Sequence, residues 1–438
     1  MSDAMELASF VTTDLCAITR GRAVAAQDLD KALARGLGWV PANLALTPQG
    51  EIAEDTPFGS SGDLRLAPDP EARIRVEIGG RTPLHFYHSD ITALDGTPWD
   101  CCVRSLLKSA LADLEEEFGL RLTAAFEHEF QIFGAGWIAA APFSLAAARR
   151  ADAFGPRLVG LLEAAGCAPE TFLPEYGTDQ YEIVCAPAPA LAAADRAVSV
   201  REITRELAAS LGWRASFAPK TAPEAIGNGV HIHFSLTESD GTPATYDPDR
   251  PGRMSERAAR FAAGIVAHMP ALAAFAAPSA VSSLRLQPHH WAASWTTLGE
   301  HDREATLRIC PTSQKPGYDP SRAFNLEFRA ADATASPHLA LALLVRAGME
   351  GLRRGFEPAP ITRGDPGAMS PAARAAAGIA RLPATPAEGL AAIVSDPVLC
   401  AALAPDLLAC YLGLRRKEQA LTADLDEAAL CARYAEIY

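Results

Sequence analysis

Four short segments of the chain alternate chemically reactive polar residues with apolar ones, at residues 126–130, 180–184, 230–234 and 325–329. Side chains on a β-strand point alternately to two faces, so each segment gathers its polar side chains on one face. The residues that share a face in this way are Glu127 with Glu129, His231 with His233, and Glu327 with Arg329. Burying such a face is costly unless cations or partners neutralise it, so the pattern predicts a strand-built site for metal ions and phosphate groups.

The carboxylates and histidines each have a simpler explanation that the sequence leaves open. An isolated Glu-x-Glu pair is more often the exposed face of an edge strand, and Glu175 and Glu182, which flank a turn, could equally be surface charges. A lone histidine on an apolar strand is more often a hydrogen-bonded core residue. Two histidines on one face beside carboxylates favour a mixed oxygen and nitrogen site for Mg²⁺ or Mn²⁺.

The charge balance of the chain limits its partners. A formal net charge of −14 argues against non-specific nucleic-acid binding, because following a phosphate backbone needs a positive surface field. Guanidinium groups bind phosphates and carboxylates in bidentate fashion, although any single arginine could instead form a surface salt bridge. No glycine-rich phosphate-binding loop of either common type is present, so bound ATP would have to be held by metals and arginines. The arginines in question are Arg285, Arg303, Arg308 and Arg329.

Cysteine usage and apolar runs indicate a cellular location. Nine cysteines without a Cys-x-x-Cys spacing fit reduced thiols. The N-terminus contains acidic residues and lacks a basic region followed by an apolar core, so a secretory signal is not expected. No uninterrupted apolar run reaches the roughly 18 to 20 residues of a membrane span. We therefore predict a cytoplasmic protein without a membrane partner.

Hydrophobic periodicity divides the chain into a small N-terminal unit and a larger unit in which helices and strands alternate. The length of 438 residues allows two or three domains, or one large catalytic domain with an appendage. Helices are predicted over residues 28–37, 103–118, 144–165 and 196–211, strands over 73–78 and 84–87, a hairpin turn at 239–241, and helical layers after residue 329.

Taken in order along the chain, these segments resemble the glutamine synthetase family, in its bacterial type I branch. Residues 127–130 look like the family's Glu-Pro-Glu-Phe strand with His in place of Pro, and residues 175–182 look like its Glu…Gly-Gln-x-Glu element. Residues 227–236 resemble its Gly-x-His-x-His-x-Ser-Leu strand, 283–288 and 303–309 its arginine segments, and 325–339 its Arg-Ile-Glu-x-Arg…Asn-Pro-Tyr-Leu segment. The ordered set spans residues 60–355 and is highly specific.

The resemblance implies a role for each matched residue. Two divalent cations, Mg²⁺ or Mn²⁺, would be held by Glu129, Glu175 and Glu182 and by Glu127, His231 and Glu327. ATP phosphates or the transferred phosphoryl group would be contacted by His233, Ser235, Arg303 and Arg308, of which the two arginines would act catalytically by stabilising negative charge. The carboxylates of the amino-acid substrate would be gripped by Arg285 and Arg329, and the substrate site would include Gly227.

The resemblance also implies an architecture. It predicts an α+β fold with an N-terminal β-grasp domain over residues 1–98 and, over residues 99–438, a catalytic α/β domain with an open antiparallel β-barrel. Such subunits assemble as stacked rings, with a dodecamer expected, and the active sites lie between neighbouring subunits.

The sequence departs from the family pattern where the attacking nitrogen should enter. Trp291 stands where the family has a glutamate over the ammonium pocket, and residues 38–42 lack the aspartate that helps to deprotonate ammonium. Two further positions differ, because Ile226 replaces an asparagine that binds the amino acid and Asn325 replaces an arginine close to the phosphate. The Asn-Leu-Tyr motif of adenylylation is also absent, so that control is not expected.

These departures favour an ATP-dependent ligase that joins glutamate, or a near relative, to an amine other than ammonia through a γ-glutamyl phosphate. Ammonium is a small cation that needs carboxylates, whereas an alkyl or aryl amine gains affinity from an aromatic wall. Two alternatives remain open. A true glutamine synthetase could use His289, His290 or a neighbouring subunit as the base, and a catalytically inactive scaffold could keep the same fold.

Overall fold

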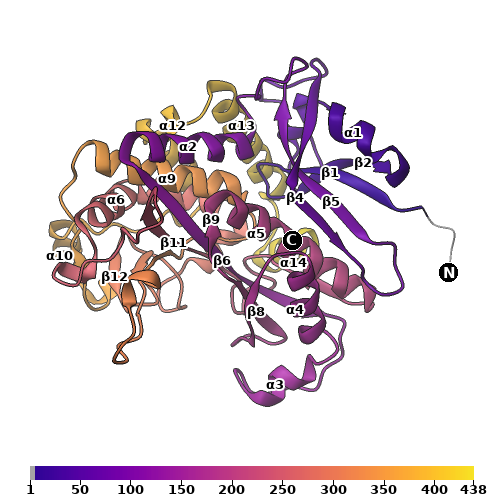
Figure 1. Ribbon diagram of the computed structural model, residues 1–438. Helices are drawn as coiled ribbons and strands as arrows, with labels where there is room; N and C mark the ends of the chain where they lie inside the picture. Colours follow the sequence, from indigo (N-terminus) through magenta and orange to yellow (C-terminus); the bar gives the residue numbers. More distant parts are fainter. Residues whose placement is uncertain (1–4) are drawn as a thin grey trace.

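The computed structural model describes residues 5–438 and places a small sheet unit beside a larger one (Figure 1). The small unit is a five-stranded sheet in the order β2-β1-β5-β4-β3, in which only the β1–β5 pair is parallel. The predicted helix and both predicted strands are present. The β-grasp description of this unit stays a prediction. The elements are β1 (Leu7–Thr13), β2 (Thr19–Ala25), η1 (Ala26–Asp28), α1 (Leu29–Arg35), β3 (Leu37–Trp39), η2 (Pro41–Ala45), β4 (Leu64–Val76) and β5 (Leu84–Thr92).

The larger unit is built on a sheet that curves into a nearly closed barrel, in the order β15-β12-β13-β14-β11-β6-β8-β7. The central pairs are antiparallel, as predicted, but β12 pairs in parallel with both β13 and β15, so the expectation of a wholly antiparallel barrel was wrong at this edge. The strands are β6 (Leu120–Phe133), β7 (Pro169–Pro174), β8 (Gln180–Cys185), β9 (Ala188–Pro189), β10 (Arg214–Ser216), β11 (Val230–Glu238), β12 (Leu298–Glu300), β13 (Leu307–Ile309), β14 (Leu326–Phe328) and β15 (Ile361–Thr362).

Helices occupy most of the remaining chain, and many begin with a proline after a capping residue. Proline at the first helical position lacks an N–H that would be unpaired there anyway, and a preceding Ser, Thr or Asp side chain accepts a bond from the first turn. The predicted helix over 144–165 is two helices, α3 (Leu145–Arg150) and α4 (Gly155–Ala164). The others are α2 (Val103–Phe118), α5 (Ala190–Ser210), η3 (Pro251–Arg253), α6 (Glu256–Ala267), α7 (Met269–Ala276), α8 (Ala280–Arg285), η4 (Pro320–Arg322), α9 (Pro337–Arg353), η5 (Pro366–Ala368), α10 (Pro371–Ala376), α11 (Pro386–Val394), α12 (Pro397–Ala401), α13 (Pro405–Thr422) and α14 (Glu427–Ile437).

One face of the barrel sheet forms the main core. Helices α2 and α5 pack on β6, and α9 packs on both of them and on α6 (Figure 1). The α6–α9 contact is close enough that a Cβ on Gly264 would lie 2.1 Å from the carbonyl oxygen of Ala347. The predicted apolar face of β11 is buried in this core, which leaves its histidines on the opposite face. That face consists of Val230, Ile232, Phe234 and Leu236.

A buried ion-pair network joins the two units. Arg104 at the start of α2 donates to Asp69 and Asp90 of the N-terminal sheet and, with both Nε and Nη2, to Asp195 of α5. Asp195 also lies 2.8 Å from the Nε2 atom of His338 in α9. A single guanidinium therefore links two strands of the small sheet to α5 of the larger unit.

No single helix among residues 5–438 has the length and apolar character needed to cross a membrane. Helices α6 and α7, which meet at a bend of 74°, together pass the same test of length and composition, although most of their residues are buried in the core.

Burial of His128 makes the fold sensitive to acid. His128 is only 2% exposed, and burial, followed by the charge of Arg201, lowers its pKa to about 3. The unfolded chain binds a proton at His128 below about pH 6.5 while the folded chain does not, so stability is lost as the pH falls from about 6.5 toward 3. At pH 5 this loss is about 2 kcal/mol.

We expect His128→Leu to remove this contribution, because leucine carries no titrating group. Urea unfolding gives the free energy of unfolding at pH 7.5 and at pH 5. The decrease in this free energy between the two pH values should be about 2 kcal/mol smaller in the variant than in the original chain. The exposed His290 provides a matched control, since His290→Leu makes the same substitution outside the core. Equal acid sensitivity of the original chain and His128→Leu would contradict the prediction.

Candidate active site

The register of the central strands brings the predicted ligands together. On neighbouring strands, His231 of β11 lies opposite Glu127 of β6, while Glu327 of β14 lies opposite both His233 of β11 and Arg308 of β13. The Nδ1 atom of His231 is 3.3 Å from a Glu127 oxygen and 3.6 Å from a Glu327 oxygen. The Nε2 atom of His233 is 3.1 Å and 3.7 Å from oxygens of the same two carboxylates.

The three remaining predicted ligands lie on the side of β8. Glu182 is opposite Glu129 in the strand register, and it offers an oxygen within 4.8 Å of ligand atoms of Glu127 and His231. The Oε2 atom of Glu129 accepts a bond from the backbone N–H of Gly229 at 2.7 Å. Glu175 enters from the loop before β8, as its place beside a turn predicted.

Crowding of these carboxylates changes their acidity. Burial, followed by the charge of Glu129, raises the pKa of Glu175 to about 7. Burial, followed by the charges of Glu127 and Glu129, raises the pKa of Glu182 to about 9. A divalent cation would relieve this repulsion, and carboxylate oxygens with one imidazole nitrogen are a donor set that Mg²⁺ or Mn²⁺ accepts. The residues present therefore fit the metal ions that the resemblance implies.

Arginines neutralise the opposite side of the site. Glu327 is 1% exposed, and its Oε2 accepts a bond from Nη1 of Arg308 at 2.7 Å, while its Oε1 is paired with Nη1 of Arg329. Burial alone would raise the pKa of Glu327, but Arg329 and then His231 outweigh it and lower the pKa to about 2. Hydrogen bonds from His231 and His233 likewise hold the pKa of Glu127 well below its usual value despite its burial.

The predicted substrate arginine Arg285 is tied to the backbone. Arg285 is 5% exposed and donates to the carbonyl oxygens of Ala330 and Ala331. A Cβ on Gly227 would lie 2.6 Å from the Cγ atom of Arg285, so only glycine allows this close approach. Gly227 and Arg285, which are both predicted to bind the amino-acid substrate, are therefore in contact.

The loop that carries Trp291 projects into solvent. Trp291 is 71% exposed, and both His289 and Trp291 have positive φ, at 63° and 53°. The carboxylate of Glu304 accepts bonds from the backbone N–H groups of His289 and Trp291 at 3.3 Å and 3.1 Å and so holds the loop in this strained form. The Nη2 atom of Arg329 reaches the carbonyl oxygen of Trp291 at 3.4 Å.

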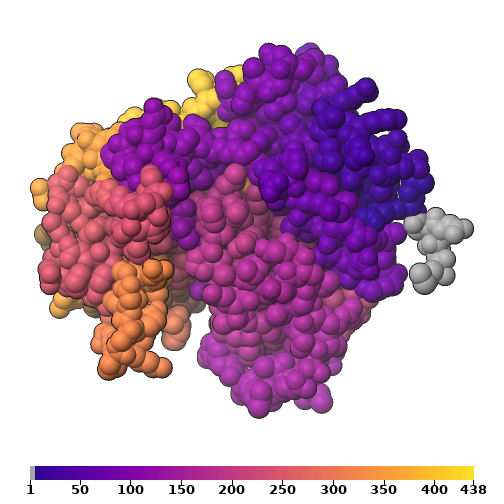
Figure 2. Space-filling view, viewed as in Figure 1, coloured from indigo at the N-terminus to yellow at the C-terminus, as the bar shows by residue number. Residues whose placement is uncertain are grey.

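Two other predicted residues lie on the loop before β13 and on β11. Arg303 is exposed in the loop before β13, although its charge acts on Glu175. Ser235 is half-buried on β11, two residues beyond His233 on the same face. Figure 2 shows the surface hollowed between the orange lobe, which follows β13, and the magenta lobe around α3 and α4.

Sequence reasoning missed Cys310 and Glu304. Cys310 directly follows β13, and its Sγ lies 3.6 Å from Oε2 of Glu327. The signal was available, because Cys310 is two residues after Arg308 and so shares its strand face. Glu304 gave no such signal, since its contact with the loop of Trp291 depends on a chain reversal that periodicity does not predict.

Models of two known protein domains match the chain. The model of the glutamine synthetase N-terminal domain matches residues 1–99, and the model of the glutamine synthetase catalytic domain matches residues 100–428. The chain belongs to the glutamine synthetase family. Members of the family are ATP-dependent ligases that form C–N bonds, using glutamate, an amine or ammonia, and divalent metal ions, and this chain is such an enzyme.

Relatives within the family carry two kinds of name. A gamma-glutamylpolyamine synthetase, GlnA3 of Streptomyces coelicolor, is 36% identical over 431 residues, which cover 96% of this chain and 91% of the relative. A glutamine synthetase of Thermococcus kodakarensis is 30% identical over 400 residues, covering 89% and 84%. The crystal structure of a novel glutamine synthase homolog is 48% identical, covers 100% of both chains and superposes with a TM-score of 0.92.

Proposed function

We propose that this protein joins the γ-carboxylate of glutamate to an amine other than ammonia, through a γ-glutamyl phosphate made with ATP. The observation that carries the choice of amine is Trp291, an exposed indole at the loop position where the family pattern places a glutamate. Without that carboxylate the loop offers little to a small ammonium ion, whereas the indole face attracts a larger organic cation.

In this proposal the ligand cluster serves phosphoryl transfer. Divalent cations, Mg²⁺ or Mn²⁺, held by the six predicted ligands would neutralise the phosphoryl charge and align the transfer. Arg308, which is 7% exposed and held by Glu327, is already oriented before substrate binds, so it would stabilise negative charge without reorganisation. His233, Ser235 and Arg303 would contact the phosphates.

Arg285, Arg329 and Gly227 would bind the amino acid in the same proposal. Both arginines are buried and anchored, so they would present a rigid pair of cations to the carboxylates of glutamate. Ile226, which is 42% exposed, adds apolar surface where the family pattern has an asparagine. This difference allows a near relative of glutamate as the acid.

The amine would approach across the loop of Trp291. Its alkyl chain would lie against the indole, whose ring face attracts a protonated amino group. The name of the Streptomyces coelicolor relative supports a polyamine as the substrate class. The general base that deprotonates the amine stays unassigned.

Of the two alternative functions, one has support from relatives and the other is disfavoured by the site. The relatives named glutamine synthetase favour ammonia as the nitrogen donor. An inactive scaffold is disfavoured because all six predicted ligands are present. His231 lies within ion-pair distance of Glu127 and Glu327, and Glu182 belongs to the same group of possible metal ligands as Glu127 and His231.

The wider organisation belongs to the same proposal. We infer a division into residues 1–98, as a β-grasp domain, and residues 99–438, which the family matches over 1–99 and 100–428 support. Assembly into stacked rings, as a dodecamer in the cytoplasm with sites between subunits, is the expectation from family membership.

An amine panel tests the proposed function. Purified protein with Mg²⁺ or Mn²⁺, ATP and glutamate should release phosphate faster with spermidine, putrescine or ethanolamine than with ammonium at the same concentration, and mass spectrometry should detect the γ-glutamyl amide. A clear preference for ammonium would replace the proposal by true glutamine synthetase activity. Absence of phosphate release with every amine would favour the inactive scaffold.

A further inference from the structure

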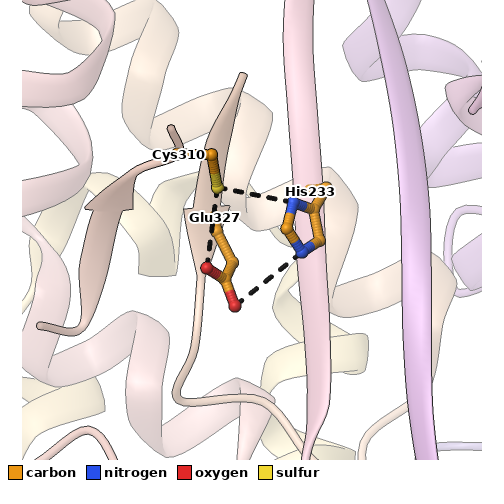
Figure 3. A group of neighbouring side chains, drawn as sticks. All are labelled: His233, Cys310 and Glu327. Carbon is orange, nitrogen blue, oxygen red and sulfur yellow. Dashed lines mark hydrogen bonds and ion pairs between the residues drawn. The ribbon is translucent and has the colours of Figure 1, made fainter. Parts of the chain in front are cut away.

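A thiol, an imidazole and a carboxylate face one another beside the carboxylate cluster (Figure 3). The Sγ atom of Cys310 lies 3.7 Å from Nδ1 of His233 and 3.6 Å from Oε2 of Glu327, and Nε2 of His233 lies 3.7 Å from Oε1 of Glu327. The three side chains come from the end of β13, from β11 and from β14. Cys310 is 5% exposed.

We propose that Cys310, His233 and Glu327 form a binding site for a thiophilic divalent cation such as Zn²⁺. In tetrahedral coordination Zn²⁺ lies about 2.3 Å from sulfur and about 2.0 to 2.2 Å from nitrogen and oxygen, which separates the ligand atoms by roughly 3.3 to 3.6 Å. The Sγ–Nδ1 and Sγ–Oε2 distances of 3.7 Å and 3.6 Å need only a small contraction to reach this geometry.

The surroundings of His233 favour coordination through Nδ1. Its other ring nitrogen, Nε2, is buried without a hydrogen-bond partner among residues 5–438, but it lies 3.1 Å from Oε1 of Glu127. A carboxylate in this position accepts a hydrogen bond from the N–H of the ring nitrogen that does not bind the metal, and so fixes the tautomer. The Oδ1 atom of Asn325, 2.9 Å from Nδ1, or a water molecule would complete the coordination.

The donor set separates this site from the oxygen-rich site next to it. Thiolate sulfur binds Zn²⁺ well and is not a ligand that Mg²⁺ takes, whereas the cluster of Glu129, Glu175 and Glu182 suits hard cations. On binding, the S–H bond of Cys310 breaks, a metal–sulfur bond forms and the proton leaves to solvent. The new thiolate adds one negative charge beside the cation, while Oε2 of Glu327 keeps a lone pair for Arg308.

Occupation of this site would be inhibitory. Zn²⁺ would engage His233 and Glu327, both of which the proposed phosphoryl transfer needs. This consequence rests on the proposed function, whereas the binding of the cation does not.

The test uses Co²⁺ as a spectroscopic substitute for Zn²⁺, because a charge-transfer absorption reports only a cobalt ion bound to thiolate and not one bound at the oxygen-rich sites. The intact protein should bind one Co²⁺ per chain with a thiolate-to-cobalt charge-transfer absorption, which Zn²⁺ displaces. Cys310→Ser should lose this absorption, and Cys400→Ser should keep it, since Cys400 is a half-buried thiol bonded to the carbonyl oxygen of Ile393. Cys310→Ala repeats the comparison if the serine variant misfolds, and circular dichroism checks each fold.

Activity provides a second, separate measurement. The Zn²⁺ concentration that halves phosphate release should rise about tenfold or more in Cys310→Ser and stay unchanged in Cys400→Ser. A charge-transfer absorption in a protein without ligase activity would overturn the proposed function alone. Absence of the absorption in the intact protein, or its persistence in Cys310→Ser, would overturn the proposed cation site.

Discussion

Glu182→Gln is expected to reduce ATP-dependent phosphate release by about 10³-fold while leaving the metal-free protein as stable as before or more stable. Burial and the charges of Glu127 and Glu129 disfavour an ionised carboxylate at Glu182, and an uncharged amide avoids this cost. The same change withdraws a charged oxygen from the cation site. Phosphate-release assays and thermal midpoints with and without Mg²⁺ measure the two effects, and the Mg²⁺-dependent rise in midpoint should largely disappear.

Glu327→Gln is the matched comparison, because it also removes one carboxylate from the cluster. Here the lost charge balances Arg308 and Arg329, so we expect a similar loss of activity together with a metal-free protein less stable by about 3 kcal/mol. If the two variants lose activity equally but change stability in opposite directions, then Glu182 acts through metal binding, whereas Glu327 also supports the structure. Full activity in Glu182→Gln would remove this residue from the proposed ligands.

Trp291→Glu is expected to shift the preference of the enzyme toward ammonium. A carboxylate at this position restores the anion that the family pattern places over the nitrogen pocket, while the loss of the indole weakens binding of larger amines. We expect the ratio of kcat/KM for ammonium to that for the preferred amine to rise by about 10- to 100-fold, which corresponds to about 1.4 to 2.7 kcal/mol. Steady-state phosphate release with each nitrogen donor measures this ratio.

Two control variants divide this effect into its causes. Trp291→Phe keeps an aromatic wall and should keep the amine preference. Trp291→Ala should lower kcat/KM for the larger amine without raising kcat/KM for ammonium. We expect each variant to keep the positive φ of Trp291, because Glu304 binds the loop through backbone N–H groups that the substitutions do not change. Identical ratios in Trp291→Ala and Trp291→Glu would show that the added charge has no role.

The site was largely predictable from sequence because it is built on strands. Period-two alternation gave the face shared by His231 and His233, and the order of the motifs identified the family that the comparisons confirm. The pairing of these histidines with Glu327 depends on strand register, which a single sequence does not provide. The family resemblance supplied that information in place of periodicity.

Other parts of the molecule could not be predicted in this way. The parallel pairing of β12 with β13 and β15 involves strands of two or three residues, which are too short to give a periodic signal. The contacts of Glu304 with the loop of Trp291 and of Cys310 with His233 are tertiary contacts of loop or strand-end residues. The strained backbone at Trp291 is likewise visible only in three dimensions.

The strands that carry Glu127, His231 and Glu327 are neighbours in space but far apart in sequence. Glu127 and His231 alone are separated by 104 positions, so closing the loop between them is one of the slower steps that a folding chain must complete. Any intermediate that lacks one of these strands lacks the cation site as well. The first appearance of tight cation binding during refolding should therefore mark the moment at which β6, β11 and β14 have paired.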